Sequence, residues 1–225
     1  MALVALMNRG KIRQLSSTRT LTTILLKDYS MVYGSDNYYS ALILKNREWV
    51  SGGDSLGISG DDAGSSVTLP FPVVIYGTNV SAVYLSTNGL LRWDNVADNR
   101  YNNYLDTSHC ILAALWDDFT TANRPDGGIY RILGSDALGE YVGYRWAMCY
   151  INSNLKADFE ILLYKSGYIQ FNIYQFQYIY SPTEYNANEF ISKGDGTNYI
   201  DLTPRRPYME SILFVPKDKF KPPIR

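Results

Sequence analysis

The sequence predicts an all-β protein: an antiparallel β-sandwich of the jelly-roll kind with extended N- and C-terminal arms. The 225 residues include 20 Tyr, and 14% of them are aromatic, a composition that favours strands. The long runs rich in Leu, Lys and Glu that build helices are missing. Short apolar stretches separated by turn residues recur along the chain at the spacing of a sandwich.

Residues 1–60 are predicted to form an N-terminal arm with edge strands. The apolar and β-branched runs 21–26 and 39–44 flank the turn-rich residues 34–37, which indicates a hairpin or two edge strands. Residues 51–66 are rich in Gly, Ser and Asp. They are predicted to be a linker or an exposed loop, and they are the best domain boundary in the chain.

Residues 61–180 are predicted to form the sandwich domain. The expected strands are 67–76, 80–86, 89–93, 110–116, 128–133, 140–150, 158–164 and 168–179. In the last of these the large residues change phase, from Ile169, Phe171 and Ile173 to Tyr174. This change predicts a bulge, or a strand covered on both faces.

Residues 181–225 lack periodicity apart from 210–215 and end in PKDKFKPPIR. They are predicted to form a C-terminal extension that packs poorly on its own.

Two turn signals in the central segment have direct physical interpretations. Pro70 and Pro72 lack backbone donors and suit an edge strand. Asn88 and Gly89 suit a tight hairpin, because such turns need positive φ angles. Trp116 ends an apolar run that points into a core.

Five pieces of the central segment occur in a familiar order: LPFP at 69–72, VYLSTNGLL at 83–91, LWDD at 115–118, GGIYR at 127–131 and FEILLY at 159–164. Together they resemble the nidogen-type, or NIDO-like, β-sandwich domain. The resemblance implies a role in adhesion or assembly, and it implies no catalytic residues.

Charge is distributed unevenly along the chain. Residues 1–27 carry a net charge of +5, residues 204–225 carry +4, and residues 28–203 carry −10. Basic ends on an acidic body predict contacts within one subunit, with neighbouring copies, or with an external polyanion such as nucleic acid or an anionic membrane surface. The basic residues assigned to assembly are Arg9, Lys11, Arg13, Arg19, Arg205 and Arg206.

Tyrosines are the second class of predicted interface residues, because Tyr offers a large amphipathic contact surface. Those assigned to assembly are Tyr38, Tyr39, Tyr174 and Tyr178. A sugar-binding platform is the alternative use of such residues, with Tyr101 and Tyr104 as further candidates.

Catalysis is expected to be absent, and no cofactor is expected. His109 is the single His and the chain has two Cys, which excludes most imidazole catalysis and nearly all zinc sites. Asp117, Asp118 and Asp126 are weak candidates for calcium ligands, and capping of turns is the alternative role. A second acidic group in the Gly- and Ser-rich loop comprises Asp54, Asp61 and Asp62.

Cys110 and Cys149 lie on two predicted strands. The sequence leaves open whether they form a disulfide or remain two thiols.

The charges near the N-terminus follow the first apolar segment, and no apolar stretch reaches the roughly 18 residues of a membrane span. An unsecreted chain without a transmembrane segment is therefore expected. Its Tyr-, Ile- and Asn-rich composition is similar to that of structural proteins of archaeal viruses. We expect a non-enzymatic virion protein, a capsid vertex, turret or tail component that assembles in the host cytoplasm as a homo-oligomer with other virion proteins. The alternative is an adhesin or carbohydrate-binding module on a cell or virion surface.

Overall fold

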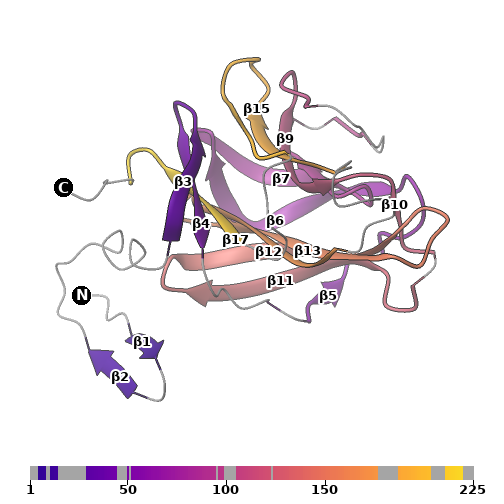
Figure 1. Ribbon diagram of the computed structural model, residues 1–225, viewed down its shortest axis with the longest axis horizontal. Coiled ribbons are helices and arrows are strands. Elements are labelled where there is room, and N and C mark those ends of the chain that lie inside the picture. Colours follow the sequence, from indigo (N-terminus) through magenta and orange to yellow (C-terminus); the bar gives the residue numbers. More distant parts are fainter. Residues whose placement is uncertain are drawn as a thin grey trace.

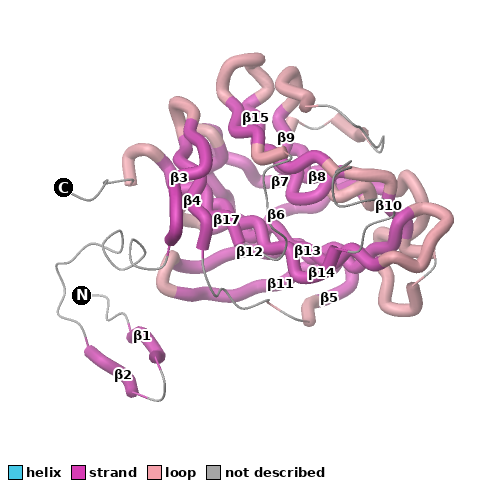
Figure 2. Tube along the Cα trace, viewed as in Figure 1, coloured by secondary structure: helices cyan, strands magenta, loops and turns pink. Residues whose placement is uncertain are grey.

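The structure is a computed structural model that describes residues 5–8, 11–14, 29–44, 50, 52–94, 96–98, 105–122, 124–176, 187–203 and 211–219. Within these ranges every regular element is a strand (Figure 2). None of the described residues belongs to a helix of the length and apolar character that a membrane crossing requires. The all-β class predicted from the sequence is confirmed.

The larger of two stacked sheets has nine strands, in the order β3-β4-β17-β14-β13-β12-β11-β5, with β10 paired to β12 (Figure 1). All its pairings are antiparallel. Its strands are β3 (Tyr29–Ser35), β4 (Tyr39–Leu44), β5 (Asp54–Ser55), β10 (Phe119–Thr120), β11 (Gly128–Asp136), β12 (Gly139–Tyr150), β13 (Lys156–Tyr164), β14 (Ile169–Phe176) and β17 (Ser211–Pro216).

The smaller sheet has six antiparallel strands in the order β16-β15-β9-β8-β7-β6. They are β6 (Gly64–Ile75), β7 (Thr78–Ser86), β8 (Leu90–Arg92), β9 (Cys110–Trp116), β15 (Asn188–Lys193) and β16 (Tyr199–Asp201). The apolar residues of both sheets meet in one core, so the predicted sandwich is confirmed.

Alternation of side chains explains how the core forms. In β13, Phe159, Ile161 and Leu163 point into it, because successive side chains of a strand face opposite ways. Trp146 of β12 stacks on Phe159, with ring centroids 5.3 Å apart. The Trp146 indole N–H also donates to Ser86 O of the other sheet at 2.8 Å, which joins the two layers directly.

A bulge occurs in β14 where the sequence predicts one. Asp158 of β13 pairs with Gln175 and Phe159 pairs with Ile173, so Tyr174 is the extra residue. Its side chain is 55% exposed.

The predicted edge strand is also confirmed. β6 lies at the edge of the six-stranded sheet, and its pairing with β7 is interrupted between Thr68 and Val73, around Pro70 and Pro72. These prolines therefore remove no ladder hydrogen bond.

The segments that flank the predicted sandwich domain belong to the same two sheets. β17 lies between β4 and β14 and is almost wholly buried, while β15 pairs with β9. The prediction that residues 181–225 form a poorly packed extension is wrong for these strands. Likewise β4 is an interior strand. β5 in the Gly- and Ser-rich segment pairs with β11, so that segment contributes to the larger sheet and is no linker between domains.

The first described residues form a small separate sheet, β1 (Ala5–Asn8) with β2 (Lys11–Gln14). Among the described residues, neither strand pairs with the two larger sheets. The strand predicted at 21–26 lies outside the described residues.

Candidate functional site

Two groups of polar residues gather at opposite ends of β6. Asp61 and Asp62 precede this 12-residue strand, and Tyr76 and Gly77 follow it. An extended strand of this length spans about 40 Å. The two groups are therefore separate sites, which we call the acidic cluster and the end pocket.

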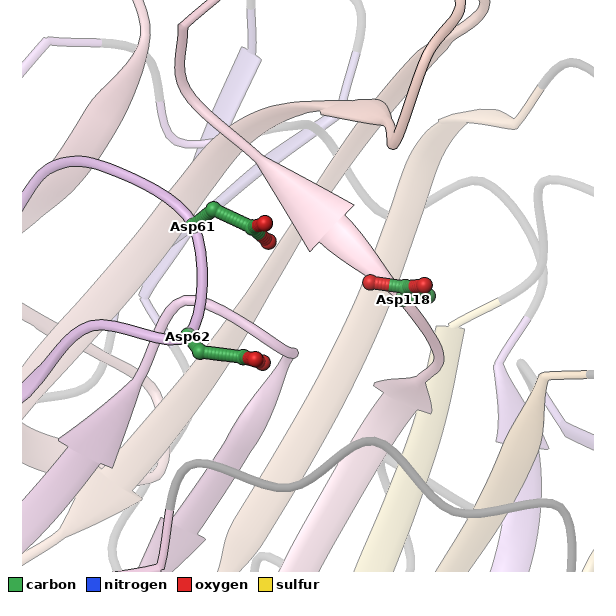
Figure 3. Close-up of side chains that lie close together, drawn as sticks. All are labelled: Asp61, Asp62 and Asp118. Atoms are coloured by element: carbon green, nitrogen blue, oxygen red, sulfur yellow. The ribbon is translucent and has the colours of Figure 1, made fainter.

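The acidic cluster consists of Asp61, Asp62 and Asp118. Figure 3 shows Asp61 and Asp62 extending toward Asp118, which follows β9, and carboxylate oxygens of the three lie within 4.8 Å of one another. Partial burial raises the pKa of Asp118, and the negative charges of Asp61 and Asp62 raise it further. Carboxylates grouped in this way are the ligand type of hard cations such as Ca²⁺.

Asn88 holds the loops of the acidic cluster together. Its side-chain amide donates to Asp62 Oδ1 at 2.7 Å, and its Oδ1 accepts from the Phe119 N–H at 2.9 Å. Its backbone carbonyl accepts from the Asp117 N–H at 3.2 Å. The residue expected to serve a hairpin turn thus also joins three loops.

The end pocket has a volume of about 520 Å³ and is built by four segments. These are the β3–β4 turn, the β6–β7 turn, the β13–β14 turn and the residues that follow β17. The lining residues that matter for its chemistry are Tyr38, Tyr39, Tyr76, Lys165, Lys217 and Lys219.

Buried tyrosines connect the walls of the end pocket. The Tyr39 hydroxyl donates to Gly167 O at 3.3 Å and accepts from the Tyr76 N–H at 3.4 Å. The Tyr76 hydroxyl donates to Asp36 Oδ2 at 2.8 Å. Burial raises the pKa of both phenols, so they stay neutral hydrogen-bond donors.

The chain matches the model of a known protein family. The family described as NIDO-related matches residues 31–211, most of the chain. The chain belongs to the NIDO-related family. No curated protein and no solved structure matches it.

Membership in the NIDO-related family agrees with the resemblance seen in the central segment, and the match reaches further in both directions. It includes β4, β15 and β16, which lie outside the predicted sandwich domain. The NIDO-related region thus supplies strands to both sheets.

The predicted calcium ligands are separated in this NIDO-related domain. Asp118 joins Asp61 and Asp62, but Asp117 is buried and its Oδ1 accepts from the Asp118 N–H at 2.8 Å. Asp126 pairs with Arg124, whose Nε lies 2.7 Å from Asp126 Oδ1. The set of Asp117, Asp118 and Asp126 is therefore wrong as a single site, because adjacent side chains diverge and Asp126 has a cationic partner.

The predicted interface residues have different outcomes. Tyr38 is half-buried and Tyr39 is buried, both at the end pocket, whereas Tyr174 is exposed at the bulge. Lys11 and Arg13 lie in β2. The remaining candidates fall outside the described residues: Arg9, Arg19, Tyr101, Tyr104, Tyr178, Arg205 and Arg206.

The two cysteines are free thiols. Cys110 lies on β9 of the six-stranded sheet and its thiol donates to Lys193 O at 3.1 Å, while Cys149 is buried on β12 of the other sheet. The disulfide considered from the sequence is not formed.

The single histidine lies in a short hydrogen-bonded loop. His109 Nδ1 is 2.7 Å from Asp106 Oδ2 and 3.1 Å from Ser108 Oγ. A catalytic relay needs the carboxylate and the hydroxyl on different ring nitrogens, and here both contact Nδ1. This geometry suits loop capping.

Proposed function

We propose that this NIDO-related chain is a non-enzymatic structural protein of an archaeal virion, and that it assembles into a homo-oligomeric ring through its N-terminal arm. A capsid vertex, turret or tail component built with other virion proteins in the host cytoplasm fits this role. The hairpin of β1 and β2 carries the proposal, because it forms a sheet apart from the sandwich. A two-stranded hairpin on its own is marginally stable in water and gains stability from a partner surface.

Charge supports a second copy as that partner. The first 27 residues carry +5, whereas residues 28–203 carry −10. A basic arm is therefore electrostatically complementary to the acidic body of a neighbouring copy.

Light scattering of the full chain tests this assembly. We expect a closed oligomer whose mass falls when Lys11→Glu and Arg13→Glu are introduced together. Lys156→Glu, an exposed residue at the start of β13, is the matched control and should leave the mass unchanged. A full chain that stays monomeric at high concentration contradicts the proposal. Salt-sensitive DNA binding lost with the same double reversal would make nucleic acid the partner of the arm.

A second candidate function is recognition of glycans on a cell or virion surface, as an adhesin or carbohydrate-binding module. The end pocket favours it, since its volume lies in the range of about 300–1,000 Å³ that is usual for ligand sites. A glycan array with the full chain tests this function. Saturable binding of any glycan supports it, and silence across the array contradicts it.

A further inference from the structure

The end pocket is held in shape by hydrogen bonds within the β3–β4 turn and between this turn and a segment distant in sequence. Asp36 Oδ1 accepts from the backbone N–H groups of Tyr38 and Tyr39, both at 2.7 Å. The Lys217 N–H donates to Tyr38 O at 2.8 Å, which ties the residues after β17 to the β3–β4 turn. Such connections pre-organise a site and reduce the entropy lost on binding.

Backbone strain is stored at the same place. Tyr76 has a φ of +51° and Gly77 one of +78°, so both central residues of the β6–β7 turn are left-handed. Asn or Gly normally occupies the first position, and a bulky residue there is an outlier. Two contacts hold Tyr76 in this left-handed conformation. Its hydroxyl donates to Asp36, and its ring stacks on Trp93 with the ring centroids 6.1 Å apart. A strained backbone conformation that the surrounding contacts hold in place is typical of ligand sites.

The lining carries an excess of positive charge. Lys165, Lys217 and Lys219 face one acidic lining residue, Asp218. Lys165 pairs with Glu140 at 3.0 Å, but both side chains are more than half exposed, so a ligand can compete for the lysine. The Lys219 ammonium donates to Ser166 O, and among the described residues Lys217 makes no ion pair.

We propose that the end pocket binds an acidic sugar, a pyranose that bears a carboxylate or sulfate group. The ammonium groups of Lys217 and Lys165 bind the anionic group. The Lys193 ammonium lies 4.5 Å from the centroid of the half-buried Tyr38 ring, and the other face of this ring packs against the apolar face of the sugar. Asn37 and Ser166, also in the lining, donate to Asn198 Oδ1 and Leu138 O, and their side-chain oxygens offer acceptors to the sugar hydroxyls. A pocket of about 520 Å³ is larger than a lone sulfate or acetate ion fills.

This inference rests on the second proposed function, glycan recognition, and is independent of assembly through the arm. Isothermal titration of the full chain with glucuronate, glucose and acetate tests it. We expect saturable binding of glucuronate, weakened about tenfold by Lys217→Gln, which removes one charge-assisted contact. Tyr38→Ala should weaken it by a similar factor through loss of the stacking surface.

Lys156→Gln is the matched control, because it removes the same charge at the far end of β13 from the pocket. Its affinity for glucuronate should equal that of the unsubstituted chain. Circular dichroism of each variant reports whether the fold is retained, and Lys217 is suited to this test because its side chain is exposed.

Each other outcome overturns the inference in a distinct way. Glucose binding as tightly as glucuronate removes the acidic specificity and leaves glycan recognition standing. Acetate binding as tightly as glucuronate would show that the pocket recognises the carboxylate and not the sugar ring. Absence of glucuronate binding, or equal loss in Lys156→Gln and Lys217→Gln, overturns the pocket assignment, while the glycan array reports separately on recognition elsewhere on the domain.

Discussion

Gly89 lies so close to Leu115 that a methyl group on its α-carbon would stand 1.8 Å from the Leu115 carbonyl oxygen. Gly89 also has a φ of +85°, which side chains rarely adopt. We therefore expect Gly89→Ala to lower the free energy of unfolding by about 3–5 kcal/mol, from overpacking and backbone strain together. Urea denaturation measures this loss.

Gly57→Ala separates the two causes in that experiment. Gly57 has a φ of +68°, but nothing lies within 4 Å of an added methyl group. Gly57→Ala should lower the free energy of unfolding by only about 1 kcal/mol, which is the cost of the left-handed conformation. Equal losses for the two variants would show that the contact with Leu115 relaxes freely.

Arg92 is fully buried and holds two carboxylates. Its Nε and one terminal nitrogen donate to Asp94 at 3.0 and 2.7 Å, and the other donates to Asp98 at 3.0 Å. We expect Arg92→Met to destabilise the fold by about 3–5 kcal/mol, because it leaves Asp98 buried without this cation. Unfolding of Arg92→Met, Asp98→Asn and the double variant checks this as a double-mutant cycle. Strictly additive losses would contradict a coupled pair.

Local sequence patterns predict the strands whose apolar residues alternate or run together. The strands at 39–44 and 110–116 lie where they were predicted. β15 was missed, since Asn188, Glu189 and Ser192 are buried polar residues that break its pattern. β17 was missed as a sheet strand because its partners, β4 and β14, are distant in sequence.

The candidate sites were predicted only in part for the same reason. Asp118 and Asp61 were each recognised, but as members of two different groups, because their approach depends on the β-bridge between Asp61 and Thr120 of β10. Tyr38 and Tyr39 were recognised as a pair. Their partners Tyr76 and Lys217 carried no local signal, since four separate segments build the end pocket.

Asp118 should make the stability of the fold fall as pH rises. Burial and the charges of Asp61 and Asp62 raise its folded pKa above the ordinary 3.8. The folded state therefore binds the proton more tightly than the unfolded chain, and stability is lost as pH rises from the unfolded to the folded pKa. Asp118→Asn should stabilise the chain at pH 7 by about 0.5 kcal/mol or less, because water screens a half-exposed group.

Thermal unfolding across pH 3 to 7 checks this dependence. The gain from Asp118→Asn should shrink toward zero at the acid end, where the aspartate is protonated in both states. A gain in stability that is the same at every pH would mean that the carboxylates of the acidic cluster do not repel one another.

Asp126 should have the opposite pH dependence. The hydrogen bonds from Arg124 lower the pKa of Asp126 to about 2, so the folded state binds its proton more weakly than the unfolded chain. The contribution of Asp126 to the stability of the fold is present above pH 3.8 and is lost as pH falls toward 2. Because the Asp126 side chain is 63% exposed, Asp126→Asn should cost only about 0.5 kcal/mol at pH 7. Urea denaturation at pH 7 and pH 2.5 should show this difference shrinking with acid, and a cost that grows with acid would rule out the Arg124 pairing as its cause.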